Sequence, residues 1–550
     1  MTQVLNQLDK LSKIKTAIKN AVKSKNIDCT LAESPNAVEQ LGKNKSQIYN
    51  IHSNTYFGQI KNDGGIDLAC SLGDVVFSNV KDIAPYALYG KLAYKKIDSL
   101  SFPMLEKISG DYACKYAVYV SSGINSVTFP ALQEITGKEA CMFMFNYSGI
   151  KNVSFPLLEH VLGKSTCDSM FKECKSLENC SFDSIVEIDG SYSCRSMFSM
   201  CEKLTNTGFS KLQKITGENT CSGMYSECNE LTSTGLDSLL LVDGKSVCSG
   251  MFECTGKFTT TGLNNLKSIS GNYACSYMFC CYPSYSSTLK DTPLSDIALT
   301  SLETIDGQYA VQYMFYNRNN IINAVFPKLK SINGSVCCGS MFAYCRGLNT
   351  ISFPVLESII GERAFTSICY QCTSLENVYF DSLHTIDGKT AFTVAFKGCT
   401  NLKRIDFPKL TNISTKAFVG SSSIYDAFVD CAALTEIHFR YDVEHIVTAL
   451  DGYSTKWGAE NATIYFDLGC SELEITPTPS DATVKFYDAE GTEIPNPTVT
   501  EVSKYAWSVG GEVFYTDNEA PSVGDEVYDS EGNLMTQTVT SINGTTITIG

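Results

Sequence analysis

The chain has 550 residues, with 59 acidic and 43 basic side chains and a formal net charge of −16. This length exceeds what one compact core holds, so we expect several domains or a repeat array. The thin spread of Lys and Arg argues against a groove that follows phosphates, and we expect no nucleic-acid partner. No segment approaches the roughly 18 apolar residues of a membrane helix, so we also expect no membrane insertion.

Residues 3–25 predict a basic amphipathic helix of about six turns. Its apolar side chains recur at steps of three and four and are Val4, Leu8, Leu11, Ile14, Ile18, Ala21 and Val22. The segment lacks the apolar stretch of a secretory signal, so we expect synthesis in the cytoplasm. Such a helix pairs with copies of itself, for instance in a trimer, or docks in a groove of a larger assembly. The alternative is a helix that caps the open end of the next domain. We assign residues 1–60 to this attachment segment.

A repeat of 27 residues, once 26, fills most of the chain and carries one glycine per unit. The glycines are Gly110, Gly137, Gly163, Gly190, Gly217, Gly244 and Gly271, then, after an insertion of about nine residues, Gly307, Gly334, Gly361 and Gly388. Counted from each glycine, positions 4, 7, 8 and 11 are mostly apolar, at the spacing of a short helix. The second half of the unit predicts a strand, a turn and another short extended piece. One unit cannot bury its apolar face alone, so we predict an α/β repeat solenoid over residues 61–420.

Cysteine recurs at positions 4 and 11 of the repeat. Position 4 also holds Val311, Phe365 and Phe392, and position 11 also holds Ser148 and Arg318. Metal ligands and disulfide partners do not exchange with Val or Phe, whereas a compact buried apolar side chain does. No cysteine pair combines CxxC spacing with a histidine partner. We therefore interpret the cysteines as core residues and expect no metal and no cofactor; disulfides formed after release into an oxidising medium stay an alternative.

The composition changes after the repeats. We assign residues 421–470 to a C-terminal cap of the solenoid. Residues 471–550 begin with a Pro-Thr linker, continue with period-two alternation at Val484 and Phe486, and contain Asp-Ser-Glu-Gly and Asn-Gly turns. These features predict a small all-β tip module.

Aromatic residues outside the clear repeats are the candidate receptor or partner contacts. The exposed strand positions of the repeats carry small polar residues, whereas sugar binding favours stacked Trp or Tyr. The chain has two Trp, Trp457 and Trp507, and both lie outside the clear repeats. We nominate these two together with Tyr282 and Tyr285, which lie at the insertion near residues 283–297. A purely structural role is the alternative for all four.

No catalytic motif stands out. The five histidines have no nucleophile or metal ligand at a recognisable spacing, and the sequence contains no GxSxG, HExxH, P-loop or dinucleotide fingerprint. We therefore expect a protein that is not an enzyme. Paired carboxylates for glycoside cleavage stay open, because geometry rather than spacing defines them.

The units at residues 356–380 and 383–410 carry a recognisable pattern. It consists of Leu, an apolar strand, Pro, Leu, Ile-Gly, Ala-Phe, Cys and Leu, and it matches Leu402, Phe407, Pro408, Leu410, Ile386, Gly388, Phe396 and Cys399. This pattern resembles the BspA-like leucine-rich repeats, although the units here are longer and lack the Asn of the commoner leucine-rich consensus. Members of that family occur on bacterial surfaces, in protozoa and in bacteriophages. The resemblance therefore implies recognition without naming a partner.

The two ends carry a second resemblance. Residues 3–25 resemble an N-terminal segment of structural proteins from tailed phages of gut bacteria, and residues 471–550 look like the β modules that end many phage tail and fibre proteins. This implies a non-enzymatic virion protein, a tail fibre or a head or tail appendage. It would bind a bacterial surface glycan or protein through the solenoid and other virion proteins through the helix. The alternative is a BspA-like adhesin on the bacterial surface; a second alternative is a polysaccharide-degrading fibre.

Overall fold

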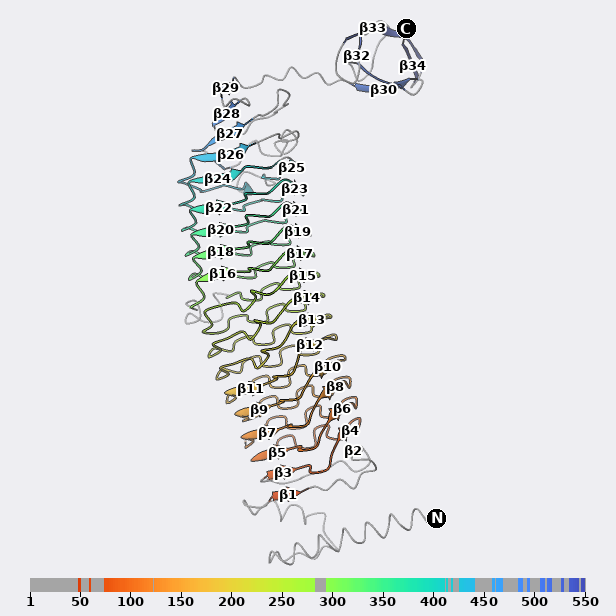
Figure 1. Ribbon diagram of the computed structural model, residues 1–550, viewed down its shortest axis with the longest axis vertical. Helices are drawn as coiled ribbons and strands as arrows, with labels where there is room; N and C mark the ends of the chain where they lie inside the picture. Colours follow the sequence, from red (N-terminus) through yellow and green to blue (C-terminus); the bar gives the residue numbers. More distant parts are fainter. Residues whose placement is uncertain are drawn as a thin grey trace, which may run out of the picture.

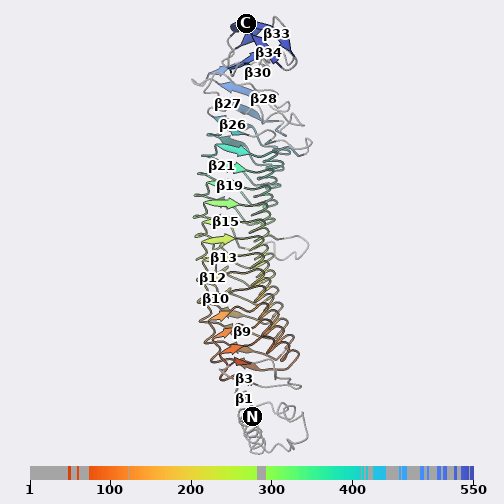
Figure 2. The same ribbon diagram turned by 90° about the vertical axis from the view of Figure 1, so that its right-hand side faces the viewer.

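The computed structural model describes residues 74–440 apart from 122, 282–292, 411, 414–416 and 419–424. It also describes residues 48–50, 59–60, 458–459, 461–467, 483–487 and 492–494 and the five C-terminal strands. The repeats wind as a solenoid of short parallel β-strands, one coil per repeat (Figures 1 and 2). Partner strands are 27 residues apart in most coils, as in the pairing of Ile332 with Ile359. The predicted repeat solenoid is confirmed in this coarse form. No helix among the described residues is long and apolar enough to span a membrane.

One face of the solenoid is a 14-stranded sheet that runs through the repeats without interruption. In its three-residue strands the middle residue is a buried Ile or Val, and the residues on either side are partly or fully exposed. The strands are β2 (Gln59–Ile60), β4 (Asp82–Ile83), β6 (Lys107–Ile108), β8 (Glu134–Ile135), β10 (His160–Val161), β12 (Glu187–Ile188), β13 (Lys214–Thr216), β14 (Leu241–Asp243), β15 (Ser268–Ser270), β17 (Thr304–Asp306), β19 (Ser331–Asn333), β21 (Ser358–Ile360), β23 (Thr385–Asp387) and β25 (Asn412–Ile413).

A second face carries two separate sheets. The six-stranded sheet is β1 (Ile48–Asn50), β3 (Asp74–Val76), β5 (Ser99–Ser101), β7 (Ser126–Thr128), β9 (Asn152–Ser154) and β11 (Asn179–Ser181). The nine-stranded sheet is β16 (Asp296–Ala298), β18 (Asn323–Val325), β20 (Thr350–Ser352), β22 (Asn377–Tyr379), β24 (Arg404–Phe407), β26 (Glu436–Arg440), β27 (Thr463–Asp467), β28 (Thr483–Tyr487) and β29 (Glu493–Ile494). Strands β26, β27 and β28 continue the parallel ladder, and β29 pairs antiparallel with β28.

The gap between these two sheets falls on three coils that share the sequence Thr-x-Thr-Gly. At residues 205–208, 232–235 and 259–262 the chain forms no strand, and the label series on this face is interrupted between β11 and β16 in Figure 1. The glycines of these motifs have positive φ values of 66–73°, which rules out extended backbone there. The three central coils therefore differ in structure from the coils on either side.

The C-terminal region contains an antiparallel sheet of its own. Its strands are β30 (Tyr505–Val509), β31 (Glu512–Thr516), β32 (Glu526–Tyr528), β33 (Leu534–Asn543) and β34 (Thr546–Ile549). The division of residues 421–550 into a cap and a separate tip module stays a prediction.

The segment after each glycine forms a run of turns, where the sequence spacing predicts a short helix. In the coil that starts at Gly110, the backbone N–H groups of Tyr112, Cys114 and Tyr116 donate to carbonyls of the next coil at 2.7–3.1 Å. The N–H groups between them donate to the carbonyl three residues back. The described repeats contain no helix, so the α part of the predicted α/β solenoid is wrong. Ser, Cys, Tyr and Phe are weak helix formers, and the stacked turns bond to neighbouring coils instead.

Glycine is required at the start of the turn segment because the backbones of neighbouring coils meet there. A Cβ atom on Gly244 would lie 2.2 Å from the carbonyl oxygen of Gly217, and one on Gly334 would lie 2.3 Å from that of Gly307. Gly244 also has a φ of +138°, a conformation that L-residues rarely adopt. The 27-residue glycine period is therefore a steric requirement of stacking.

Three columns of stacked aromatic rings run through the core along the solenoid. The column at position 8 extends from Phe145 through Tyr225 to Phe342, with neighbouring ring centroids 5.2–5.4 Å apart. Along the six-stranded sheet, a column from Phe77 to Phe209 has centroids 4.6–5.2 Å apart. Along the nine-stranded sheet, a column from Phe326 to Phe439 has centroids 4.8–5.6 Å apart. Each such pair contributes about 0.5–1.5 kcal/mol beyond its buried area. The columns fix the register of one coil on the next.

The 21 cysteines that the structure describes are all buried, which agrees with their interpretation as core residues. Position 11 has a further requirement that the sequence interpretation missed. The Cys201 Sγ atom donates to the carbonyl of Phe171 at 3.1 Å, and Thr255 Oγ1 and Arg318 Nε make the equivalent contact in their own coils. A side-chain donor, rather than a small apolar group, is therefore what Cys, Thr and Arg share there.

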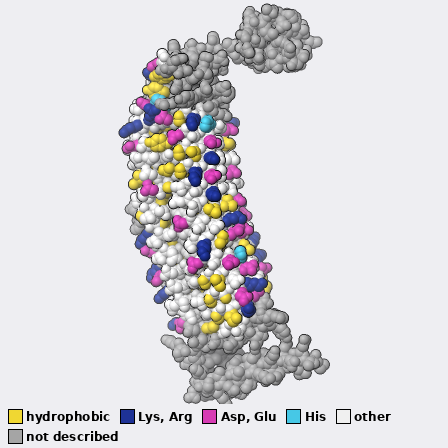
Figure 3. All heavy atoms as spheres, viewed as in Figure 1, with side chains coloured by type: hydrophobic (Ala, Val, Ile, Leu, Met, Phe, Trp, Pro, Cys, Tyr) yellow, Lys and Arg dark blue, Asp and Glu magenta, His cyan; other side chains and the backbone are white. Residues whose placement is uncertain are grey.

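Ion pairs between neighbouring coils stabilise the outer surface weakly. Lys175 Nζ lies 2.7 Å from Glu202 Oε1, and Lys214 Nζ lies 2.7 Å from Glu187 Oε1. Charges of both signs are scattered over the face shown in Figure 3, among hydrophobic side chains and other uncharged surface. Because most of these pairs are exposed, we expect packing rather than charge to hold the coils together.

Candidate recognition surface on the turn segments

The outer side of the turn segments forms a continuous surface, which we call the turn face. It consists of positions 1, 2, 5, 6, 9 and 10 of successive coils. Positions 2, 6 and 10 adopt positive φ in nearly every coil, including Tyr112 (57°), Tyr116 (57°) and Tyr147 (58°). Side chains at most of these positions are partly or fully exposed, whereas a few small ones such as Ser169 and Cys254 are buried.

The first three coils display a cluster of aromatic rings, which we call the N-terminal tyrosine patch. Its members are Tyr86, Tyr89, Tyr94, Tyr112, Tyr116, Tyr119, Phe143 and Tyr147. Tyr86 and Tyr112 stack at 4.9 Å, whereas the Tyr119 ring is nearly perpendicular to those of Tyr94 and Tyr147. Tyr94 is 73% exposed and Tyr147 is 47% exposed. These rings contact one another and are still partly exposed to solvent.

Lysines lie against the rings of this patch. Lys115 Nζ is 5.4 Å from the ring centroids of both Tyr112 and Tyr116, and it pairs with Glu139 at 2.5 Å. Lys138 Nζ is 5.4 Å from the Tyr112 centroid. A hydrogen bond with the Tyr112 side chain raises the pKa of Lys138. The lysines are therefore charged at neutral pH and are held near aromatic faces.

A second cluster of tyrosines occupies the turn face on either side of the insertion. Tyr273 stacks on Tyr309 at 4.7 Å and Tyr277 on Tyr313 at 4.9 Å. At positions 9 and 10, a row of alternately perpendicular rings runs through Tyr316, Tyr344 and Tyr370. The second patch thus repeats the geometry of the first, with less of its ring surface exposed.

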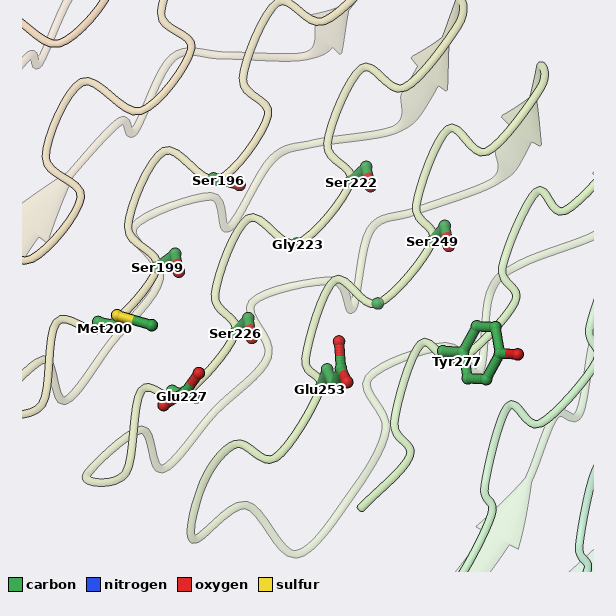
Figure 4. Close-up of a pocket in the computed structure, with 11 residues that line it drawn as sticks. Ser196, Ser199, Met200, Ser222, Gly223, Ser226, Glu227, Ser249, Glu253 and Tyr277 are labelled. Carbon is green, nitrogen blue, oxygen red and sulfur yellow. The ribbon is translucent and has the colours of Figure 1, made fainter. Parts of the chain in front are cut away.

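Between the two patches the turn face is hollowed. Small residues replace the rings at position 6, where Ser196, Gly223 and Gly250 follow one another in consecutive coils. The resulting hollow of about 470 Å³ is lined mainly by serines (Figure 4). Glu227 and Glu253 project from adjacent coils within it. Burial and then the charge of Glu227 raise the pKa of Glu253. The polysaccharide-degrading alternative therefore keeps a candidate carboxylate pair here.

One buried ion pair lies between the N-terminal patch and the hollow. The Asp168 side chain is fully buried, and its Oδ2 atom accepts hydrogen bonds from Arg195 Nε at 3.1 Å and Nη2 at 2.8 Å. Burial raises the pKa of Asp168, while Ser169 and Arg195 oppose this rise. The half-exposed guanidinium also lies 5.0 Å from the Tyr192 ring centroid. This arrangement joins two neighbouring coils.

The sequence-predicted contact residues are not brought together by the described part of the structure. Tyr282, Tyr285 and Trp457 lie outside the described residues. Trp507 lies in β30 and pairs with Phe514 of β31, but its side chain is outside the description. The predicted attachment helix (Val4, Leu8, Leu11, Ile14, Ile18 and Val22) is likewise outside it. All of these nominations stay predictions.

The sequence analysis missed the tyrosine patches because it searched the strand positions for aromatic residues. The available signal is a pair of Tyr residues four apart within one unit, which occurs at Tyr112 and Tyr116 and then in two neighbouring units at Tyr273 and Tyr277 and at Tyr309 and Tyr313. In a helix these residues would share the solvent-exposed face with other polar side chains, and nothing would distinguish them as a binding site. In a run of turns they occupy successive left-handed positions and point outward.

Comparison with known proteins identifies the repeat. The BspA type leucine rich repeat region matches residues 308–439 in six copies. A search of the curated proteins finds no match. Among solved structures, the crystal structure of the mouse RP105/MD-1 complex is similar at 10% identity, over 77% of this chain and 72% of that one, with a TM-score of 0.20. Residues 308–439 of this chain are therefore leucine-rich repeats of the BspA type.

Proposed function

We propose that this chain is a non-catalytic, adhesin-like recognition protein whose solenoid presents the turn face to another surface. The observation that carries the proposal is the exposure of ordered tyrosine rings on that face, led by Tyr94 and Tyr147. Clustered exposed aromatic side chains are typical of interaction sites, because Tyr supplies contact area at a low entropic cost.

The construction of the solenoid supports this role. Each coil is hydrogen-bonded to the next through its turn segment and is stacked through the aromatic columns. The tyrosines are therefore pre-positioned, and a partner does not have to order them on binding. Weak contacts at successive coils add when a ligand repeats along its own length.

Placement in a phage virion stays a prediction of the sequence. It rests on residues 3–25, which lie outside the described residues, and on the resemblance of residues 471–550 to phage tail modules. A trimer formed through the N-terminal helix likewise stays a prediction. The BspA-type repeats favour the adhesin-like alternative, which requires only that the solenoid bind a surface.

The test is flow cytometry of the fluorescent full-length chain on a panel of intact bacterial and animal cells. We expect saturable binding to some surfaces, lost when Tyr112, Tyr116, Tyr309 and Tyr313 are replaced by Asn. A Tyr379→Asn variant is the matched control, because Tyr379 is 44% exposed but lies in β22, away from the turn face. Absence of binding to every surface, or release of reducing ends from bound polysaccharide, would contradict the proposal.

A further inference from the structure

We infer that the N-terminal tyrosine patch binds an acidic polysaccharide, with sugar rings against the tyrosines and sugar carboxylates on the neighbouring lysines. This inference rests on the proposed recognition function and specifies its ligand class. It follows from two properties of the patch, the ring geometry and the local charge.

The ring geometry suits a ligand with apolar faces and polar edges. Because the Tyr119 ring is perpendicular to its neighbours in the coils before and after it, the row of Tyr94, Tyr119 and Tyr147 offers both ring faces and ring edges to solvent. A pyranose has C–H groups on its faces and hydroxyl groups around its edge. The faces match aromatic surfaces, and the hydroxyls match the phenol groups, which both donate and accept hydrogen bonds.

The local charge is opposite to that of the chain as a whole. The turn segments 84–96, 110–121 and 137–148 contain five lysines and two acidic residues, whereas the chain carries a net charge of −16. Lys115 is neutralised by Glu139. Lys95, Lys96 and Lys138 form no ion pair with another described residue, and Lys138 lies over Tyr112. A cationic site next to aromatic rings complements an anionic ligand.

These properties together favour an acidic sugar polymer over the other occupants. A neutral glycan would use the rings but leave the unpaired lysines without a partner. An acidic peptide would use the lysines but has no flat C–H face for each ring. A polymer of uronic acids presents a ring and a carboxylate in every unit, and the row of Tyr94, Tyr119 and Tyr147 places one ring on each of three successive coils. Several units can therefore be engaged in the same register.

The test measures binding of the full-length chain to three polymers by isothermal titration calorimetry. The polymers are polygalacturonate, its fully methyl-esterified form, which keeps the ring but loses the charge, and polyglutamate, which keeps the charge but lacks the ring. We expect binding to polygalacturonate that weakens with added salt, and affinities roughly ten-fold lower or worse for the other two. Equal affinity for the ester, equal affinity for polyglutamate, or no binding to polygalacturonate would overturn the inference.

Variants locate the site. Tyr112→Asn/Tyr116→Asn should reduce the affinity for polygalacturonate by roughly ten-fold or more, and Asn suits the left-handed backbone at both positions. Tyr309→Asn/Tyr313→Asn is the matched control in the second patch, and its affinity should be unchanged. Lys138→Gln removes an exposed charge without disturbing packing. If a tyrosine double variant does not fold, the affinity of Lys138→Gln for polygalacturonate still tests the site. Unchanged affinity in Lys138→Gln would refute the charge assignment.

The two proposals fail separately. If cells are still bound through the turn face but polygalacturonate is not, the ligand class is wrong and the recognition function stands. If neither is bound, both are wrong.

Discussion

Replacing Gly244 by Ala tests whether backbone contact between coils is what requires a glycine in each unit. The new Cβ atom would lie 2.2 Å from the Gly217 carbonyl oxygen, whereas ordinary contacts begin near 3.4 Å. One of the two coils must move, at a cost of about 1–3 kcal/mol for a tightly packed site. The positive φ of +138° adds about 1–2 kcal/mol for any L-residue. We therefore expect a total loss of about 2–5 kcal/mol, measured as a lower midpoint of urea unfolding followed by circular dichroism.

Gly223→Ala is the matched control in the adjacent coil. Gly223 also has a positive φ, of +60°, but its Cβ would meet nothing closer than the Ser196 hydroxyl oxygen at 3.5 Å. This variant should lose only the conformational term, about 1–2 kcal/mol. Hydrogen exchange should show the extra loss in Gly244→Ala as opening of the coils around residues 217–270, because repeat units are stabilised mainly by their neighbours. Equal losses in the two variants would refute the argument from close approach.

Three further predictions concern single contacts. Cys201→Thr should be more stable than the nearly isosteric Cys201→Val by about 1 kcal/mol, because only Thr keeps a donor to the Phe171 carbonyl; equal unfolding midpoints would show that the donor is irrelevant. Val336 is a β-branched residue at a φ of 53°. Val336→Asn should therefore raise the free energy of unfolding by about 1 kcal/mol, which a higher melting temperature would show. Arg195→Met should lower the free energy of unfolding by about 3 kcal/mol at pH 7. Since burial raises the pKa of Asp168 in the folded state, the fold binds its proton more tightly than the unfolded chain does. The loss of stability in Arg195→Met should therefore shrink as pH falls toward 5, and the double variant with Asp168→Asn should not show this loss.

The repeat architecture could be predicted from sequence because its causes are local and periodic. A glycine that cannot be replaced returns every 27 residues, and the apolar residues between glycines exceed what one unit can bury. The turn segment could not be predicted in the same way. Apolar residues at positions 4, 7, 8 and 11 fit one face of a helix, but they fit the inner side of successive four-residue turns equally well. The choice depends on hydrogen bonds to the neighbouring coil, which a single unit does not reveal.

The same ambiguity between a helix and a run of turns kept the turn face from being predicted. A helix would place Tyr112 and Tyr116 on its outer side among other polar residues, with no special backbone. The turns place each at a positive φ, where Asn, Gly or Ser occupy the same position in other coils, as at Asn219, Ser246 and Gly250. Large aromatic residues gain nothing locally from this conformation. Their clustering in the first three coils and again on either side of the insertion is therefore better explained by a ligand than by folding.

The three central coils show that the two sides of the solenoid vary together. There the Thr-x-Thr-Gly motif removes the strand on one side, and small residues at position 6 remove the rings on the other. Tyr225 takes the place of Phe in the stacked column and donates its hydroxyl to the Thr207 carbonyl at 2.9 Å. This buried carbonyl belongs to the first such motif, so the core has been adapted to the missing strand. The central coils therefore separate the two aromatic patches along the solenoid, and the core beneath them is adapted to that change.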